Sequence, residues 1–224
     1  EKSYATSWAG LGATRSHETL IIPTAGMLNP QEGEISVWAY VTKRIIDGGS
    51  WQGFLCNRFA SNEWGFYVAR TNSTEKVQFR LRFKTFVQDF DSPISLQEGD
   101  WILITLKWDV DTIKLLFNGV VGIETENIYN VTFADITFIG SHRGVNEFAN
   151  TLFDDLRISN RARTDEEILA AYQSGQPLQK DEYTTYLMPF NGSIYPVEQC
   201  WVPLGTFWSL DWDSPDDSLE ATVT

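Results

Sequence analysis

Apolar and polar residues alternate along most of this chain with a period of two, which is the pattern of antiparallel strands that bury one face. In residues 34–41, for example, every second side chain is Ile, Val or Ala. Asn118-Gly119 between two such runs predicts a tight hairpin, because both turn residues must accept a positive φ. The predicted strands are residues 34–41, 65–70, 76–83, 101–108, 112–117, 120–123, 136–140, 151–159, 183–190 and 206–212. About ten strands at this spacing predict an all-β fold, a two-sheet antiparallel jelly-roll sandwich.

One helical segment interrupts the strands, and its two ends are marked in the sequence. Thr164 followed by Glu167 has the spacing of a capping box, in which each side chain bonds to the backbone of the other residue. Apolar residues then recur at helical spacing until Gly175, a residue type that commonly ends helices. The pattern predicts a short capped helix near residues 164–174.

A polar break, Gln179-Lys180-Asp181-Glu182, follows the helix and marks a candidate domain boundary. We therefore expect residues 1–180 to form the sandwich and residues 181–224 to form a β-rich extension. Alternation continues almost to the last residue, which is the pattern of a chain cut within a strand. The extension is thus expected to begin a following module of a longer protein.

Charge and composition exclude some partners and leave others open. With 17 Lys and Arg against 30 Asp and Glu the net charge is −13, so nucleic acid and anionic lipid are poor partners. No apolar run reaches the roughly 18 residues of a membrane span, so membrane insertion is not expected. Cys56 and Cys200 favour two buried thiols, with a single disulfide as the alternative. Aromatic residues make up 14% of the chain, and they either fill a thick core or stand exposed as stacking platforms.

Several segments, taken in order, carry a resemblance to one family. The first is a strand with a central Trp at residues 34–41, followed by a Gly-x-Trp strand at 99–108 and an Asn-Gly hairpin at 114–120. The last is an ending in which Ile-Gly, within residues 138–140, is followed by Asp-Asp-Leu-Arg-Ile and the capped helix, within residues 153–168. This order resembles the laminin-G-like jelly-roll family of the concanavalin A-like lectin and glucanase superfamily over residues 4–178. The resemblance implies a concanavalin A-like sandwich that binds at a surface, although fold alone does not fix function.

Residues 205–212, Gly-Thr-Phe-Trp-Ser-Leu-Asp-Trp, resemble modules that follow such domains in bacteriophage tail and bacterial surface proteins. This second resemblance implies an extracellular or virion location. It also implies other virion or surface-protein modules as partners, and a homo-oligomer is compatible with it.

Catalytic chemistry has little support in the sequence. Glucanases of the superfamily that the chain resembles place paired carboxylates on one strand as Glu-x-Asp-x-x-Glu, and no predicted strand has that spacing. His17 and His142 are the two histidines, and neither neighbours a nucleophile motif. We therefore expect no enzyme activity, with a degenerate or unrecognised glycoside hydrolase as an alternative.

Three loops are the predicted places for ligand binding. Trp51 and Trp64 each lie in a Gly-containing loop, where a Trp is harder to assign to a core. His142, Arg143 and Asn146 lie in a third loop that is rich in hydrogen-bonding groups. Because sugar rings stack on flat aromatic faces, these residues predict a site for a polysaccharide or cell-surface glycan. Two alternatives stay open: the Trp side chains plug the end of the sandwich, or the whole domain is a structural spacer without a ligand.

Asp154 is the candidate metal ligand. By alternation with Leu152, Leu156 and Ile158 it is predicted to point to the buried side of its strand, while Asp155 is predicted to face solvent. A buried lone carboxylate is costly, so it needs a cation or several hydrogen-bond donors. The family resemblance implies a structural Ca²⁺ held by Asp154 and backbone carbonyls, and backbone amides bonded to the carboxylate are the alternative.

Overall fold

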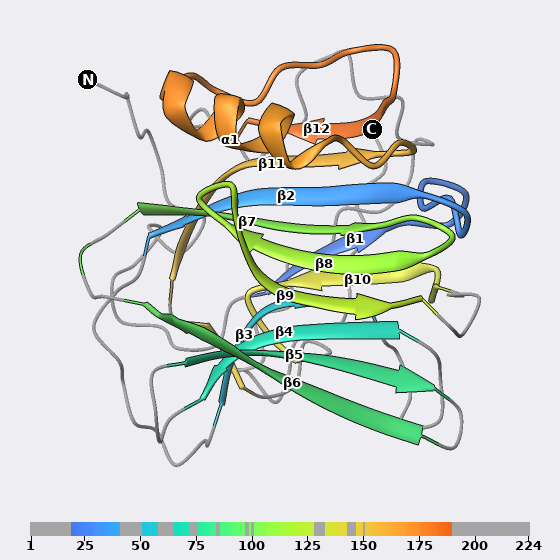
Figure 1. Cartoon of the computed structure of the whole chain (residues 1–224), viewed down its shortest axis with the longest axis vertical. Helices are drawn as coiled ribbons and strands as arrows, with labels where there is room; N and C mark the ends of the chain where they lie inside the picture. Colours follow the sequence, from blue (N-terminus) through green and yellow to red (C-terminus); the bar gives the residue numbers. More distant parts are fainter. Residues whose placement is uncertain are drawn as a thin grey trace, which may run out of the picture.

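The computed structural model describes residues 19–40, 51–57, 65–71, 76–83, 86–96, 99, 101–127, 133–142, 147–149 and 151–189 (Figure 1). Over these ranges the chain forms twelve strands and one helix. The alternation of apolar and polar residues therefore gives the all-β fold that the sequence predicts.

The described strands form two antiparallel sheets of six strands each. The first sheet has the order β1-β10-β3-β4-β5-β6, with bounds β1 (Leu20–Pro23), β10 (Ile136–Ile139), β3 (Trp51–Cys56), β4 (Gly65–Thr71), β5 (Lys76–Phe83) and β6 (Phe86–Ser95). The second sheet has the order β12-β11-β2-β7-β8-β9, with bounds β12 (Thr184–Met188), β11 (Leu152–Ser159), β2 (Gly33–Tyr40), β7 (Trp101–Trp108), β8 (Thr112–Phe117) and β9 (Val120–Glu126). In Figure 1 the strands from β11 to β9 follow one another down the view, and β4, β5 and β6 lie below them.

The main core lies between the two sheets and is made by the inward-facing half of each alternating strand. Phe54 of β3 and Phe153 of β11 meet across it, with ring centroids 6.5 Å apart in an edge-on arrangement. Both side chains are buried, and burying a Phe stabilises a fold by roughly 1.5–3 kcal/mol. The predicted alternation is confirmed in β2, where Ile35, Val37 and Ala39 face this core.

Helix α1 (Asp165–Ser174) confirms the predicted capped helix. Thr164 is its N-cap, the capping box with Glu167 is formed, and Gly175 ends it in the left-handed conformation with a φ of 61°. Ile168 packs with Trp38 and other outward-facing residues of the second sheet, so α1 covers the outer face of that sheet. Among the described residues no helix has the length and apolar character needed to cross a membrane.

The predicted Asn118-Gly119 hairpin is confirmed between β8 and β9. Asn118 has a φ of 54° and Gly119 a φ of 79°, as a turn with two left-handed residues requires. A Cβ at Gly119 would lie 2.4 Å from the Cα of Leu169 in α1. The turn therefore needs glycine both for its own conformation and for the close packing of the helix on it.

Strand β12 extends the second sheet past residue 180. It pairs with β11 in antiparallel fashion, and Tyr186 and Met188 face the main core. Residues 190–224, including the strand predicted at 206–212, lie outside the described residues. The division of the chain into a sandwich and a following module accordingly stays a prediction.

The sequence prediction for Asp154 and Asp155 is wrong about which carboxylate is buried. The pairing of β11 with β2 shifts between Asp154 and Arg157, so two residues of β11 oppose one of β2 in a β-bulge. Asp155 has a φ of 47° there, is 6% exposed and accepts a hydrogen bond from the Leu178 N–H at 3.3 Å. Asp154 is half-buried. The extra residue of the bulge reverses the alternation on which the prediction rests.

Candidate functional site

The outer face of the first sheet carries a group of packed side chains that is separate from the main core. Trp51 of β3 and Tyr67 of β4 meet on this side, with ring centroids 6.4 Å apart. Tyr67 packs there with Cys56, Ala69 and Phe138 of the same sheet. Trp51 is half-buried.

Gly53 allows the Tyr67 ring to lie close against β3. A Cβ at Gly53 would lie 2.9 Å from that ring and 2.9 Å from the carbonyl carbon of Ser141. The sequence predicts a flexible Gly-rich loop at Trp51, and this prediction is wrong, because Trp51 begins β3 and Gly53 lies inside the strand. The glycine marks close packing here and not a turn.

Two polar residues reach the same place from the segment that follows β10. The Tyr67 hydroxyl donates a hydrogen bond to Glu147 Oε2 at 2.6 Å. The His142 ring lies 4.7 Å from the Tyr67 ring, and its Nδ1 lies 3.7 Å from the same carboxylate oxygen. We call Trp51, Tyr67, His142 and Glu147 the Tyr67 cluster. Tyr67 is 1% exposed, while the His142 and Glu147 side chains are 13% and 21% exposed and form the accessible rim.

The backbone holds Glu147 in this position. The Gly53 N–H donates to the Glu147 carbonyl oxygen at 2.7 Å, and Phe148 forms a parallel bridge with Gly53. Glu147 has a φ of 54°, in the left-handed region that residues other than Gly and Asn seldom adopt. Such strain costs of order 1–3 kcal/mol and persists where surrounding contacts hold it. A strained residue whose carboxylate reaches an aromatic pair is a candidate for a functional role.

The chemistry of the Tyr67 cluster suits the binding of a polar ring. Aromatic side chains contact the apolar C–H face of a sugar, a carboxylate accepts hydrogen bonds from hydroxyl groups, and an imidazole can donate or accept. The Tyr67 hydroxyl is buried and already donates to Glu147. Its oxygen is therefore not an accessible nucleophile.

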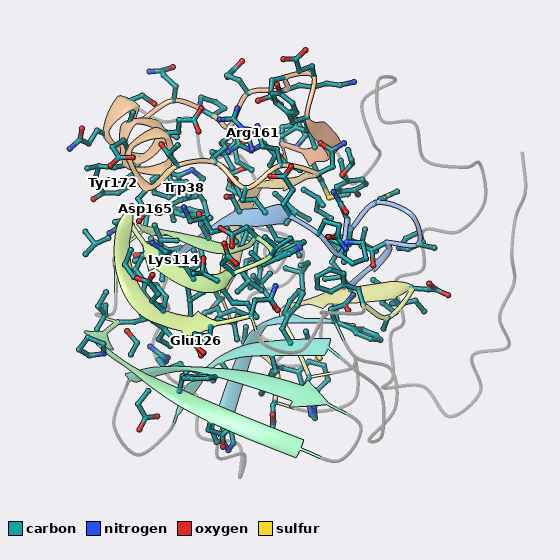
Figure 2. The ribbon with its side chains drawn as sticks, turned by 45° about the vertical axis from the view of Figure 1, so that its right-hand side comes forward. Trp38, Lys114, Glu126, Arg161, Asp165 and Tyr172 are labelled. Carbon is teal, nitrogen blue, oxygen red and sulfur yellow. The ribbon has the colours of Figure 1, made fainter. Side chains whose placement is uncertain are left out.

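A charged cluster lies on the opposite sheet, beneath α1. Asp165, the first residue of the helix, pairs with Lys107 and, at 3.2 Å, with Lys114; Figure 2 shows Asp165 and Lys114 on the helix side of that sheet. Burial raises the pKa of Asp165, but the hydrogen bonds and charges of the two lysines outweigh burial and hold the pKa below its usual value. Arg163 pairs with Asp181 nearby. These pairs fasten α1 and the segment after it to the second sheet.

Asp154, the predicted calcium ligand, lies at the bulge of β11. Its Oδ1 accepts a hydrogen bond from the Asp155 N–H at 2.9 Å. In the part of the chain that the structure describes, no three His, Cys, Asp or Glu side chains gather in the manner of a metal site. Because Ca²⁺ takes about six to eight oxygen ligands, the described carboxylates supply at most part of a calcium site.

Residues 15–169 match the protein family described as the concanavalin A-like lectin/glucanases superfamily. The chain belongs to this superfamily. The match confirms the family and the fold that the sequence resemblance implies. Among curated proteins, none matches the chain.

Solved structures with this lectin fold include glycan-binding domains. The chain is similar to the Ruminococcus gnavus IT-sialidase CBM40 bound to alpha2,3 sialyllactose, with a TM-score of 0.52, 17% identity, and 66% of this chain and 86% of that chain covered. It is also similar to botulinum neurotoxin type C, whose cell entry is dependent upon interaction with two ganglioside molecules, with a TM-score of 0.54, 12% identity, and 70% and 40% covered. The chain spans 36% of the length of the botulinum neurotoxin C/D mosaic and serotype G binding domains. At these identities the likeness shows the fold alone.

In this member of the lectin/glucanase superfamily the structure brings together Trp51 and His142, two residues predicted for a glycan site. Trp64, Arg143 and Asn146 lie outside the described residues, so their predicted role stays a prediction. The Tyr67 ring joins the pair, since it packs against both Trp51 and His142.

Sequence reasoning missed Tyr67 and Glu147 as members of the cluster. Glu147 belongs to the same polar loop as His142, and this was an available signal. Tyr67 carries no comparable signal, because the alternation of β4 predicts the face of the sheet to which it points and not what it meets there.

Proposed function

We propose that the chain is a non-catalytic carbohydrate-binding or adhesion module that binds a polysaccharide or cell-surface glycan at the Tyr67 cluster. The observation that carries the proposal is the meeting of an aromatic pair with His142 and Glu147 at a partly exposed rim. The likeness in fold to a CBM40 domain bound to alpha2,3 sialyllactose supports it, because a sandwich of this kind can carry a glycan site.

Binding at such a site is expected to be weak. A shallow aromatic platform stacks one or two sugar rings while most hydroxyl groups keep their water, so little net free energy remains. We expect a Kd between about 1 µM and 1 mM, which corresponds to roughly −8 to −4 kcal/mol.

We further propose that the module belongs to a bacteriophage tail or bacterial surface protein and acts outside the cell or on the virion. The resemblance of residues 205–212 to modules of such proteins supports this location. Several copies in one assembly would raise the apparent affinity by about 10²–10⁴-fold without any new contact. A structural Ca²⁺ at Asp154 is the remaining part of the proposal.

A structural spacer without a ligand is the second candidate function. The observation that favours it is the burial of Tyr67, which is 1% exposed. An aromatic ring packed so closely serves stability as well as binding. If the cluster binds a glycan, a change at its accessible rim should alter binding. If the chain is a spacer, the same change should alter only stability.

Trp51→Ala separates these functions, with Trp101→Ala as a matched control. Both tryptophans are half-buried and begin their strands, but Trp101 belongs to the second sheet. A glycan array and pull-down on bacterial cell-wall polysaccharide measure binding, and thermal melting measures stability. We expect Trp51→Ala to lose up to about tenfold in affinity with a small change in Tm, and Trp101→Ala to keep binding. If both variants bind equally well, the glycan-binding surface does not include Trp51. If the unaltered protein binds no glycan, the spacer function is favoured.

A further inference from the structure

Glu147 offers one carboxylate oxygen to a ligand. Its Oε2 is engaged by the Tyr67 hydroxyl and lies near His142 Nδ1. The Glu147 side chain makes no other hydrogen bond within the described structure, so no described residue donates to its Oε1. With 21% of the side chain exposed, this oxygen is within reach of a molecule bound at the rim.

The position of this carboxylate is fixed from several sides. The Glu147 backbone is bonded to Gly53, the left-handed φ of 54° sets the direction of its side chain, and the Tyr67 hydroxyl holds Oε2 at 2.6 Å. A side chain held in this way cannot swing away from an incoming group without losing the Tyr67 bond. The ligand therefore meets a fixed acceptor beside an aromatic ring.

A fixed carboxylate selects its ligand by charge and by hydrogen-bonding character. Carboxylate oxygens accept hydrogen bonds and cannot donate them, so hydroxyl and ammonium groups suit this position. A ligand carboxylate or sulfate would meet a like charge within a few ångström. The net charge of −13 on the whole chain adds to that repulsion at longer range.

We infer that Glu147 makes the Tyr67 cluster selective for uncharged or amino sugars over sugars that carry a carboxylate or sulfate. The inference rests on the proposed function and names the ligand class of the same site. It sets this chain apart from the CBM40 domain of similar fold, whose bound sialyllactose is an anionic sugar. Two like unit charges about 4 Å apart in water cost a ligand roughly fivefold in affinity, and more where water is excluded.

The test uses the full chain on an array of matched glycans, each in a neutral form and in a sialylated or sulfated form. Lactose and alpha2,3 sialyllactose are one such pair. We expect each neutral member to bind at least about fivefold more tightly than its anionic partner. Glu147→Gln should narrow that difference to less than about twofold, because the amide oxygen still accepts from Tyr67 while the charge is gone.

Glu166→Gln is the control, since it removes the same charge from an exposed position on α1, away from the first sheet. It should leave the neutral-to-anionic ratio unchanged. Anionic glycans that bind as well as neutral ones, with binding lost in Trp51→Ala, would overturn this inference and leave the proposed function standing. A preference that persists in Glu147→Gln would also overturn it. If no glycan binds, the proposed glycan-binding function and the inferred selectivity are both wrong. If a variant does not fold, the ratio of neutral to anionic glycan affinity measured on the unaltered protein still tests the predicted selectivity.

Discussion

Asp155 combines an unusual backbone with a buried carboxylate. Its φ of 47° places it in the left-handed region, and its Oδ2 accepts from the Leu178 N–H at 3.3 Å. Leu178 follows α1 and packs with Ile168 on the outer face of the second sheet. The bulge thus joins a strand of the sheet to the segment that covers it, through one side chain.

Replacement of Asp155 is predicted to separate the roles of its backbone and its carboxylate. Asp155→Ala leaves the buried Leu178 N–H without that acceptor and puts an unfavourable residue at positive φ, so we expect a loss of about 1–3 kcal/mol. Asp155→Asn keeps an acceptor oxygen and tolerates positive φ, so its loss should be smaller by at least about 1 kcal/mol. Urea unfolding measures both. Equal losses in the two variants would show that neither the acceptor nor the φ matters at this position.

Asp154 carries the prediction of a structural calcium. If its carboxylate is a ligand, removal of calcium with a chelator should lower the Tm, because a ligand that binds only the folded state stabilises it by mass action. Asp154→Ala should then melt at the same temperature with and without calcium. An unchanged melt of the unaltered protein in chelator would end this part of the proposal.

The error at Asp154 and Asp155 shows where residue-scale prediction stops. Alternation assigns faces correctly while the pairing is regular, and it does so for Ile35, Val37 and Ala39. A bulge inserts one residue and reverses every assignment on one side of it. Nothing in the local sequence distinguishes Asp-Asp in a bulge from Asp-Asp in a regular strand.

At the scale of elements, α1 is attached to the second sheet partly by charge. Asp165 pairs with Lys107 and Lys114, and Asp181 with Arg163. For Asp181, as for Asp165, burial raises the pKa, but the hydrogen bond from Thr184 and the charge of Arg163 outweigh burial and lower the pKa. Both carboxylates are therefore held ionised to lower pH in the folded chain than in the unfolded chain.

The direction of these pKa shifts predicts an acid-sensitive attachment. A carboxyl group with a lowered pKa in the folded state contributes stability that is present above its unfolded pKa, about 3.9 for Asp, and is lost as pH falls through the folded pKa. We expect the free energy of unfolding to fall between about pH 5 and pH 3, and this fall to shrink in Asp165→Asn. At pH 7 that variant should lose no more than about 1 kcal/mol, because the pair is partly exposed.

Urea unfolding of Asp165→Asn at a series of pH values checks this, with Glu166→Gln as the matched variant. Both residues lie in the first turn of α1, and Glu166 is exposed and makes no ion pair among the described residues. If the two substitutions change the pH dependence of the free energy of unfolding equally, that dependence comes from net charge and not from the ion pairs of Asp165 with the lysines.

The elements of the two sheets differ in how well the sequence predicts them. Every described strand of the second sheet lies within or overlaps a predicted one, because each contains a run of alternating apolar residues long enough to be recognised, even in β11 with its bulge. The first sheet contains the three strands that sequence reasoning missed, β1, β3 and β6. Pro23 ends β1 and Pro93 lies in β6, and Gly53 lies in β3. Pro is tolerated there because β1 and β6 are the edges of the sheet, and an edge position depends on the whole fold.

At the scale of the whole molecule, the two outer faces of the sandwich differ. The second sheet is covered by α1, and the Tyr172 ring of the helix lies 5.7 Å from the ring of Trp38. Figure 2 labels both residues on this side of the molecule. The first sheet carries the Tyr67 cluster, with the partly exposed His142 and Glu147 at its rim. The superfamily and its layers follow from the sequence, whereas the cluster depends on segments brought together by folding. The face of the first sheet is accordingly where the proposed function is tested.

The superfamily to which the chain belongs includes glucanases, so hydrolysis of a glycan by this chain has to be tested. Asp89 and Asp91 of β6 are two residues apart and share a face of the first sheet, since Phe90 between them packs toward the core. Their Cα atoms are expected to lie about 6.7 Å apart on a strand. Carboxyl groups roughly 5–5.5 Å apart serve retaining glycosidases, and groups about 6.5–9.5 Å apart serve inverting ones. Asp89 and Asp91 are therefore the pair to test for catalysis.

We predict that the chain releases no reducing sugar from β-glucans, agar or alginate. Glycosidases need one carboxyl group as acid and the other as base or nucleophile, and they obtain this difference from unequal surroundings. Asp89 and Asp91 lie opposite Arg80 and Gln78 of β5, but both are exposed on β6, an edge strand of the described sheet. Neither therefore lies in the enclosed surroundings in which such a difference is maintained. Reducing-sugar assays over long incubations, with Asp89→Asn and Asp91→Asn as paired variants, measure this. Turnover that disappears in either single variant would make the chain a glycoside hydrolase, and turnover that persists in both would trace the activity to a contaminant or to carboxylates elsewhere in the chain.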